Sequence, residues 1–223
     1  MKNSIRRIKS ILRKSPFIYK LNCIIKEKTS TNRYSLAEKG SELCIEAYPS
    51  SANSFLYYYI RYVNKEFKIA HHTHTVANIK LALRNDIPTY VIIRNPIDAI
   101  SSNLSRFNTD VKCAILDYTE FYEYCLANVS SLTVLSFEEV VGNPSEVVNM
   151  IFENMGMPER LEKDYTEEVK AFMKEIEPNK DKLSLPNQNR NDEKSALKLE
   201  IENSTEFLKA KKVYEDLIKS IKG

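Results

Sequence analysis

The chain has 223 residues, of which 43% are hydrophobic and 28% are charged. A chain of this size and composition buries a conventional core without disulfides or metals, as one domain or as a domain with an appendage. The four glycines have no repeated spacing, which excludes the GxGxxG dinucleotide fingerprint and the GxxxxGK(S/T) phosphate loop.

The net charge of +3 is unevenly distributed along the chain. Residues 1–28 carry nine lysines and arginines against one glutamate, a net charge of +8, which leaves −5 for the rest. Binding to a phosphate backbone needs a basic surface on the folded domain itself. We therefore expect no nucleic-acid partner.

The cysteines and the apolar runs bear on the compartment. The four cysteines are widely spaced and form no CxxC pair, which is typical of reduced thiols. No apolar run approaches the roughly 20 residues that cross a bilayer, and residues 1–30 lack the apolar stretch of a secretory signal. The prediction is a cytoplasmic protein.

The N-terminal segment predicts a basic amphipathic helix. Ile5, Ile8, Ile11 and Leu12 recur at helical spacing among basic residues, and Pro16 is expected to end the helix. Such a helix can rest on an anionic membrane through residues 1–16, or it can pack on the domain or remain an arm. We divide the chain into a basic helical arm, 1–40, and a main domain, 41–223.

Strand and helix patterns alternate from about residue 42 onward, and we expect strands at 43–47, 67–70, 89–93 and 132–137. Helices are predicted to begin near Asn53 or Ser54, near Val76, at Asn95-Pro96 and at Asn143-Pro144. All but the one near Val76 are expected to have an asparagine or serine as N-cap. The charged tail is predicted to be helical from residue 159, with an interruption at 185–190 and a last helix that buries residues from Ala196 to Ile221, Leu199 among them. This alternation predicts an α/β fold, a three-layer α/β/α arrangement around a central parallel sheet.

Polar segments follow the first three predicted strands. They are residues 48–54, 71–74 and 94–102. Ligands of open α/β sheets bind outside the carboxyl ends of the strands, so these segments form the predicted site. Backbone amides at a helix N-terminus, an imidazole and a guanidinium together suit a phosphorylated ligand.

All three of these segments carry a family resemblance. The run Tyr48-Pro49-Ser50-Ser51-Ala52-Asn53-Ser54-Phe55-Leu56 resembles the 5′-phosphosulfate loop of the sulfotransferase family, Tyr-Pro-Lys/Arg-Ser-Gly-Thr/Asn-Thr/Ser-Trp/Phe-Leu. The run from Arg94-Asn95-Pro96 to Ser102 resembles that family's 3′-phosphate motif, and His72-Thr73-His74 stands where cytosolic members have Lys-Thr-His. The resemblance covers about residues 42–155, and more loosely 185–214.

The resemblance implies a P-loop-like sulfotransferase fold and transfer of sulfate from 3′-phosphoadenosine 5′-phosphosulfate (PAPS) to a hydroxyl or amine, with the bisphosphate PAP as product. The implied acceptor is a carbohydrate, a lipid or another small molecule. His74 would accept the acceptor's proton. The remaining implied roles are the 5′-phosphate for Ser51, Ala52, Asn53 and Ser54, the adenine for Phe55, and the 3′-phosphate for Arg94, Ser102 and Arg190.

Two positions depart from the family pattern. Ser50 stands at the catalytic-site position of a lysine or arginine, and Ala52 replaces a glycine. Another cation, from His72, Lys39, Arg61 or Lys80, could replace the missing charge. One alternative is therefore a PAP- or PAPS-binding pseudoenzyme or scaffold of the same fold, and a kinase-like enzyme lacks the phosphate-loop lysine.

Several further side chains have two interpretations. The cluster of His71, His72 and His74 suggests zinc, but no cysteine or acid has a supporting spacing, so we expect no metal. Glu138 and Glu139 either orient a catalytic group or cap a helix. The tyrosines at 57–59 are interpreted as packing residues. The acceptor's identity and the oligomeric state are not readable from the sequence.

Overall fold

The computed structural model describes residues 15–27, 35–107, 110–157, 160–176 and 191–222. Within these ranges the sheet consists of β1 (Leu43–Ala47), β2 (Ile69–His71), β3 (Thr89–Ile93) and β4 (Thr133–Ser136). All neighbouring pairs are parallel, and the order is β2-β1-β3-β4. The predicted parallel α/β sheet is confirmed, although β2 begins two residues later than expected and includes His71.

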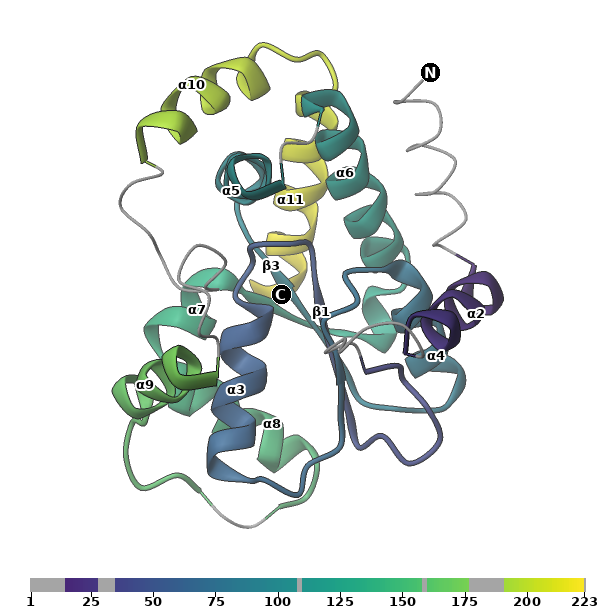
Figure 1. The fold of residues 1–223 in the computed structure, drawn as a ribbon, viewed down its shortest axis with the longest axis vertical. Coiled ribbons are helices and arrows are strands. Elements are labelled where there is room, and N and C mark those ends of the chain that lie inside the picture. Colours follow the sequence, from purple (N-terminus) through teal and green to yellow (C-terminus); the bar gives the residue numbers. More distant parts are fainter. Residues whose placement is uncertain (1–14, 28–34, 108–109, 158–159, 177–190, 223) are drawn as a thin grey trace.

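Helices connect and cover the strands (Figure 1). They are α2 (Pro16–Glu27), α3 (Asn53–Val63), α4 (Val76–Arg84), α5 (Pro96–Phe107), α6 (Val111–Ala127), the 3-10 turn η1 (Val129–Ser131), α7 (Phe137–Gly142), α8 (Pro144–Asn154), α9 (Thr166–Ile176), α10 (Asn191–Glu202) and α11 (Phe207–Lys222).

Two apolar cores lie on opposite faces of the sheet, which makes the fold three-layered. Successive side chains of a strand point to opposite faces. Thus Tyr90 and Ile92 of β3 pack in the core that α3, α8 and α9 cover, whereas Val91 and Ile93 pack in the core under α4, α5, α6 and α11. Figure 1 shows these two groups of helices on either side of the strands.

Two predicted helix starts have different outcomes in detail. Helix α5 begins at Pro96, and the Asn95 side chain accepts the backbone N–H of Ile97 as an N-cap does (3.1 Å). Helix α8 begins at Pro144 as expected, but Asn143 makes no side-chain cap bond. Glu139 forms a capping box with Ser136 at the start of α7, so its helix-capping interpretation is confirmed.

The ends of the chain differ from expectation. Residues 1–14, which hold most of the predicted amphipathic helix, lie outside the described residues. The sequence predicts that a helix ends at Pro16, whereas α2 begins there. Tyr19 and Cys23 of α2 pack against Ala77 of α4. The predicted last helix is two helices, because the chain breaks between α10 and α11, and Leu199 is 63% exposed rather than buried.

The cysteines and the helix lengths complete the description. All four cysteines are free thiols. Among the described residues, no helix combines the length and apolar character needed to cross a membrane.

Candidate functional site

The order of the strands places the candidate site. β1 lies between β2 and β3, so the chain leaves β1 toward one side of the sheet for β2 and returns to the other side for β3. The crevice outside the carboxyl ends of two such strands is where open α/β sheets bind ligands. The segments after β1 and β3, residues 48–54 and 94–96, therefore meet at the topological switch point.

The loop from Tyr48 to Ala52 turns sharply into α3. Ser50 (φ 66°) and Ala52 (φ 64°) both have left-handed backbone conformations. Ala52 is the N-cap residue and makes no side-chain cap bond, so the prediction that Asn53 or Ser54 caps α3 is wrong. Asn53 and Ser54 both lie inside the first turn of α3. The left-handed conformation of Ala52 directs the chain into the helix one residue earlier than expected.

Polar side chains in this loop are buried without partners. Among the described residues, the hydroxyls of Ser50 and Ser51 and both amide atoms of Asn53 make no hydrogen bond. Ser51 is 1% exposed and Asn53 is 3% exposed. Each unpaired buried polar group costs about 1–3 kcal/mol, so their gathering at the N-terminus of α3 indicates a ligand. The helix dipole and the first N–H groups of α3 favour an anion there.

Ala52→Gly is expected to raise the free energy of unfolding by about 0.5–1 kcal/mol. The left-handed conformation costs alanine a Cβ clash that glycine lacks, and this gain exceeds the extra freedom of glycine in the unfolded chain. Chemical denaturation would measure the change. The matched control, Ala196→Gly in the exposed face of α10, should lower stability by about 1 kcal/mol, and a loss of stability at both positions would contradict the strain argument.

Arg94 joins the two loops. Its Nη1 donates a hydrogen bond of 2.7 Å to the Ser50 carbonyl, and its guanidinium lies 4.2 Å from the ring centroid of Phe137. Burial lowers the pKa of Arg94, opposed by the charges of Asp98 and Glu138, and arginine remains charged at neutral pH. Arg94 therefore brings a positive charge to the residue at which the family pattern has its lysine or arginine.

The turn after β2 lies against the end of β1. His74 Nδ1 is 2.8 Å from the Ala47 carbonyl, and a carbonyl only accepts, so Nδ1 carries the ring proton and Nε2 has a free electron pair. Burial, with the charges of His72 and Arg106, lowers the pKa of His74 to about 4. His74 is therefore a neutral imidazole at pH 7, with the tautomer that a general base requires at Nε2.

A buried acid that the sequence analysis missed holds this turn. Glu46, in the middle of β1, is fully buried and accepts hydrogen bonds from the backbone N–H groups of Thr73 (3.2 Å) and His74 (2.8 Å). It also accepts from the Thr73 hydroxyl (2.6 Å) and from the Asn78 amide (2.8 Å). Burial raises the pKa of Glu46 to about 7 despite these bonds. The signal in the sequence is a single acid inside an otherwise apolar strand.

The other two histidines take different positions. His72 Nδ1 is 3.2 Å from the Ser54 hydroxyl, which connects the turn to the first turn of α3. The His71 ring stacks on Tyr57 at 3.4 Å between centroids, and burial lowers the pKa of His71 to about 3. Within the described ranges no group of three or more histidine, cysteine, aspartate or glutamate side chains is arranged to hold a metal ion.

The structure thus brings together Ser50–Ser54, His72, His74 and Arg94, and leaves other predicted site residues apart. Ser102 lies in the second turn of α5 and makes no described contact with Arg94. Phe55 is half-buried and packs edge to face against Tyr59 (6.0 Å). Arg190 lies outside the described residues.

Of the four residues predicted as sources of a replacement cation, three lie away from the 48–54 loop. Arg61 donates to the carbonyl of Phe67 (3.1 Å) beyond the far end of α3, and Lys80 lies 5.2 Å from the Tyr124 ring centroid. Lys39 lines a cavity beside β2. His72 alone of these four has a described contact with the 48–54 loop.

The buried histidines predict a loss of stability in acid. Because the pKa values of His71 (about 3) and His74 (about 4) lie below the ordinary 6.5, the unfolded chain binds more protons between pH 4 and 6.5. Their contribution is complete above pH 6.5 and is lost as the pH falls through 4. Glu46 opposes this effect, because its pKa is raised from 4.5 to about 7. Its contribution to stability is present below pH 4.5 and is lost as the pH rises through 7.

Denaturation of the wild type and of His71→Phe between pH 4 and 8 tests this expectation. The phenylalanine keeps the stacking on Tyr57 and removes the titrating group, so stability should fall less steeply below pH 6.5. Identical slopes in the two proteins would contradict the assigned burial of His71.

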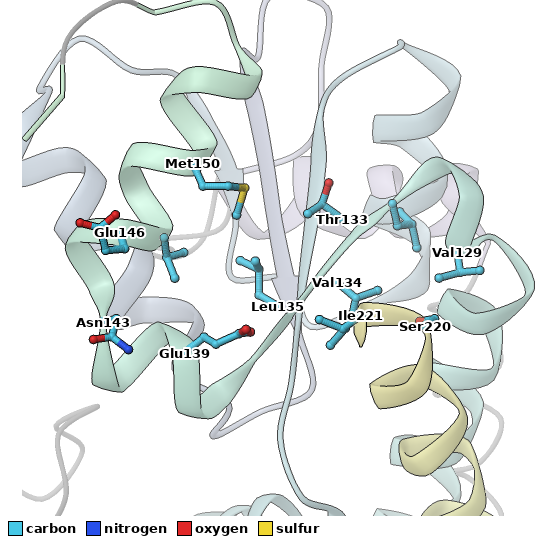
Figure 2. A pocket seen from close by; sticks show the side chains of 12 residues that line it. Val129, Thr133, Val134, Leu135, Glu139, Asn143, Glu146, Met150, Ser220 and Ile221 are labelled. Carbon is cyan, nitrogen blue, oxygen red and sulfur yellow. The ribbon is translucent and has the colours of Figure 1, made fainter. Parts of the chain in front are cut away.

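Two of the cavities in the described part of the chain are lined by residues other than Ser50–Ser54, His72, His74 and Arg94. The larger, about 600 Å³, runs along β4 between α8 and α11. Figure 2 shows Thr133, Val134 and Leu135 of β4 between Met150 on one side and Ile221 on the other. The smaller, about 450 Å³, lies beside β2 and is lined by His71.

Comparison with known proteins adds no assignment. No protein-family model matches the chain, and none of the curated proteins matches it.

Proposed function

We propose that the protein is a PAPS-dependent sulfotransferase that transfers sulfate to a hydroxyl or amine of a carbohydrate, lipid or small-molecule acceptor. The observation that carries the proposal is the Arg94 to Ser50 hydrogen bond (2.7 Å) across the switch point, beside a neutral His74. It joins the segments after β1 and β3, and the contacts of His72 with Ser54 and of His74 with Ala47 bring in the third segment that resembles a family motif.

The residues present suit an anionic nucleotide. Ser50, Ser51 and Asn53 have buried polar atoms that need partners, and they surround the N-terminus of an 11-residue helix. Arg94 supplies a guanidinium, which binds phosphate through charge-assisted hydrogen bonds. PAPS would supply the activated sulfuryl group.

His74 has the geometry of the general base in this reaction. Its Nε2 takes the proton of the acceptor hydroxyl as the acceptor oxygen bonds to sulfur and the bond between sulfur and the 5′-phosphate oxygen breaks. The hydrogen bond to the Ala47 carbonyl keeps the ring oriented throughout. The Ser54 hydroxyl and the α3 amides stabilise the charge that develops on the leaving phosphate, as an oxyanion hole does.

Calorimetry with PAP and ADP tests the nucleotide assignment. The wild type should prefer PAP, and Arg94→Ala should weaken PAP binding about 10- to 100-fold because a hydrogen bond to a charged group contributes about 1.5–3 kcal/mol. Arg160→Ala, which also removes one arginine but from an exposed pair with Glu146, is the matched control and should bind PAP normally. Equal affinity for PAP and ADP, or an unchanged affinity in Arg94→Ala, would overturn the assignment.

Transfer of radiolabelled sulfate from PAPS to a panel of acceptors tests catalysis separately. We expect turnover by the wild type. A wild type that binds PAP but transfers no sulfate to any acceptor would favour the pseudoenzyme alternative, in which Ser50, at the position of the family's lysine or arginine, marks the loss of turnover.

A further inference from the structure

The 450 Å³ cavity beside β2 is formed by three parts of the chain. They are α3, the strand β2 with the residues before it, and the segment 35–41. This segment covers the outer edge of β2, since Ser35 and His71 exchange backbone hydrogen bonds of 3.0 and 3.2 Å. The cavity is therefore open to the surface and is bounded by α3 and β2 on one side and by a bridged segment on the other.

The lining of the cavity is positively charged. Lys39, Arg61 and Lys68 contribute three cations. Glu38 is the acid among the lining residues, and it pairs with Lys20 of α2 at 3.5 Å, which offsets its charge. Because the cations come from three separate parts of the chain, only the fold gathers them around one volume.

His71 is a second, independent sign of a ligand in this cavity. It lines the cavity, it is 6% exposed, and its Nδ1 is buried with no hydrogen-bond partner among the described residues. Stacking on Tyr57 at an interplanar angle of 13° holds the ring in place. A neutral imidazole still carries one N–H donor, so it can hydrogen-bond an anion without first taking up a proton.

The cavity adjoins the candidate catalytic residues through this histidine. The ring centroid of His71 is 5.9 Å from that of His72, which in turn is 5.0 Å from that of His74. His71, at one end of the cavity, is thus two ring-to-ring contacts from the base at His74.

We propose that this cavity binds an anionic group of the acceptor, a carboxylate or a sulfate ester, so that the substrate class is an acidic carbohydrate or a small molecule of similar charge. The inference rests on the proposed function for the identity of the acceptor. It adds the position and the charge of the acceptor subsite, which the resemblance does not supply.

Two double variants with the same change in charge test the subsite. Lys39→Gln/Lys68→Gln removes two lining cations, and Lys65→Gln/Lys174→Gln removes two exposed lysines that do not line the cavity. Glutamine is preferred to glutamate because the carboxylate of Glu42 accepts the backbone N–H of Lys68 (2.9 Å) and would repel a new acid.

The probes are inorganic sulfate and glucuronate, with glucose as the neutral control, added to the isotope-labelled full chain with and without saturating PAP. We expect both anions, and not glucose, to shift the NMR signals of residues 38–41 and 67–71. The cavity double variant and His71→Phe should each weaken this binding, the double variant by about tenfold, whereas the control double variant should bind normally. Shifts in both double variants alike would indicate an adventitious ion and overturn the proposal.

Sulfate transfer to a glucuronate-containing oligosaccharide then tests the acceptor role. The cavity double variant should raise its KM about tenfold and leave kcat unchanged, with normal PAP affinity by calorimetry. Normal PAP binding with no anion effect at the cavity would overturn this inference alone. Anion binding without any PAP binding would overturn the proposed function and, with it, the acceptor role of the cavity.

Discussion

His74→Ala is expected to lower kcat for sulfate transfer by about 10²- to 10⁴-fold, the usual contribution of a general base, while the affinity for PAP is retained. The reason is local. His74 Nδ1 binds the Ala47 carbonyl, and so Nε2 is the atom available to take the acceptor's proton. Sulfate transfer in single-turnover experiments, with PAP affinity by calorimetry, measures both quantities.

The pH dependence of kcat/KM distinguishes a base from a residue that only shapes the turn. A base acts unprotonated, so activity is present above its pKa and lost below it. Because the pKa of His74 is lowered to about 4, the fall in kcat/KM that His74 itself causes should lie toward pH 4 rather than near 6.5. It is measured in Glu46→Gln, which removes the group whose pKa is raised to about 7. Circular dichroism at each pH would show that the protein remains folded. A Glu46→Gln profile that falls near pH 6.5, or a His74→Ala variant of normal kcat, would exclude the assigned role.

Glu46→Ala is expected to lower the free energy of unfolding by about 3–5 kcal/mol. The carboxylate accepts four hydrogen bonds, and its removal leaves the buried N–H groups of Thr73 and His74 and the Asn78 amide without that acceptor. His72 and His74, both in left-handed conformations, lose the group that holds their turn. Denaturant unfolding measures the loss.

Glu42→Gln is the matched control, since Glu42 is an exposed acid next to the same strand that accepts one backbone bond from Lys68. Its effect should be below about 1 kcal/mol. Glu46→Gln keeps the volume but turns one oxygen into a donor that faces other donors, so it should be intermediate and should lower kcat with PAP affinity retained. Such a split would identify Glu46 as a positioning residue for His74. Equal effects of the Glu42 and Glu46 substitutions would refute it.

The site at the switch point was predictable in its segments but only partly in its contacts. Residues 48–54, 71–74 and 94 were identifiable because each follows an apolar strand, and the carboxyl ends of parallel strands meet at one edge. The Arg94 to Ser50 hydrogen bond was not, because it joins residues 44 positions apart. The start of α3 directly after Ala52 was not predictable either, because nothing in the identity of an alanine indicates a left-handed backbone conformation.

The bounds of β1 and β3 were determined by local pattern, because short and mainly apolar runs suit a sheet that is covered on both faces. β2 begins two residues later than predicted, and β4 is one residue shorter at each end. The tertiary structure decided what these strands present to a ligand. Three features depend on groups from distant parts of the chain: Glu46 binds the histidine turn, Arg94 binds the loop after β1, and three cations surround His71. Only the fold brings these groups together, because hydrogen bonds and charges act over short distances in space.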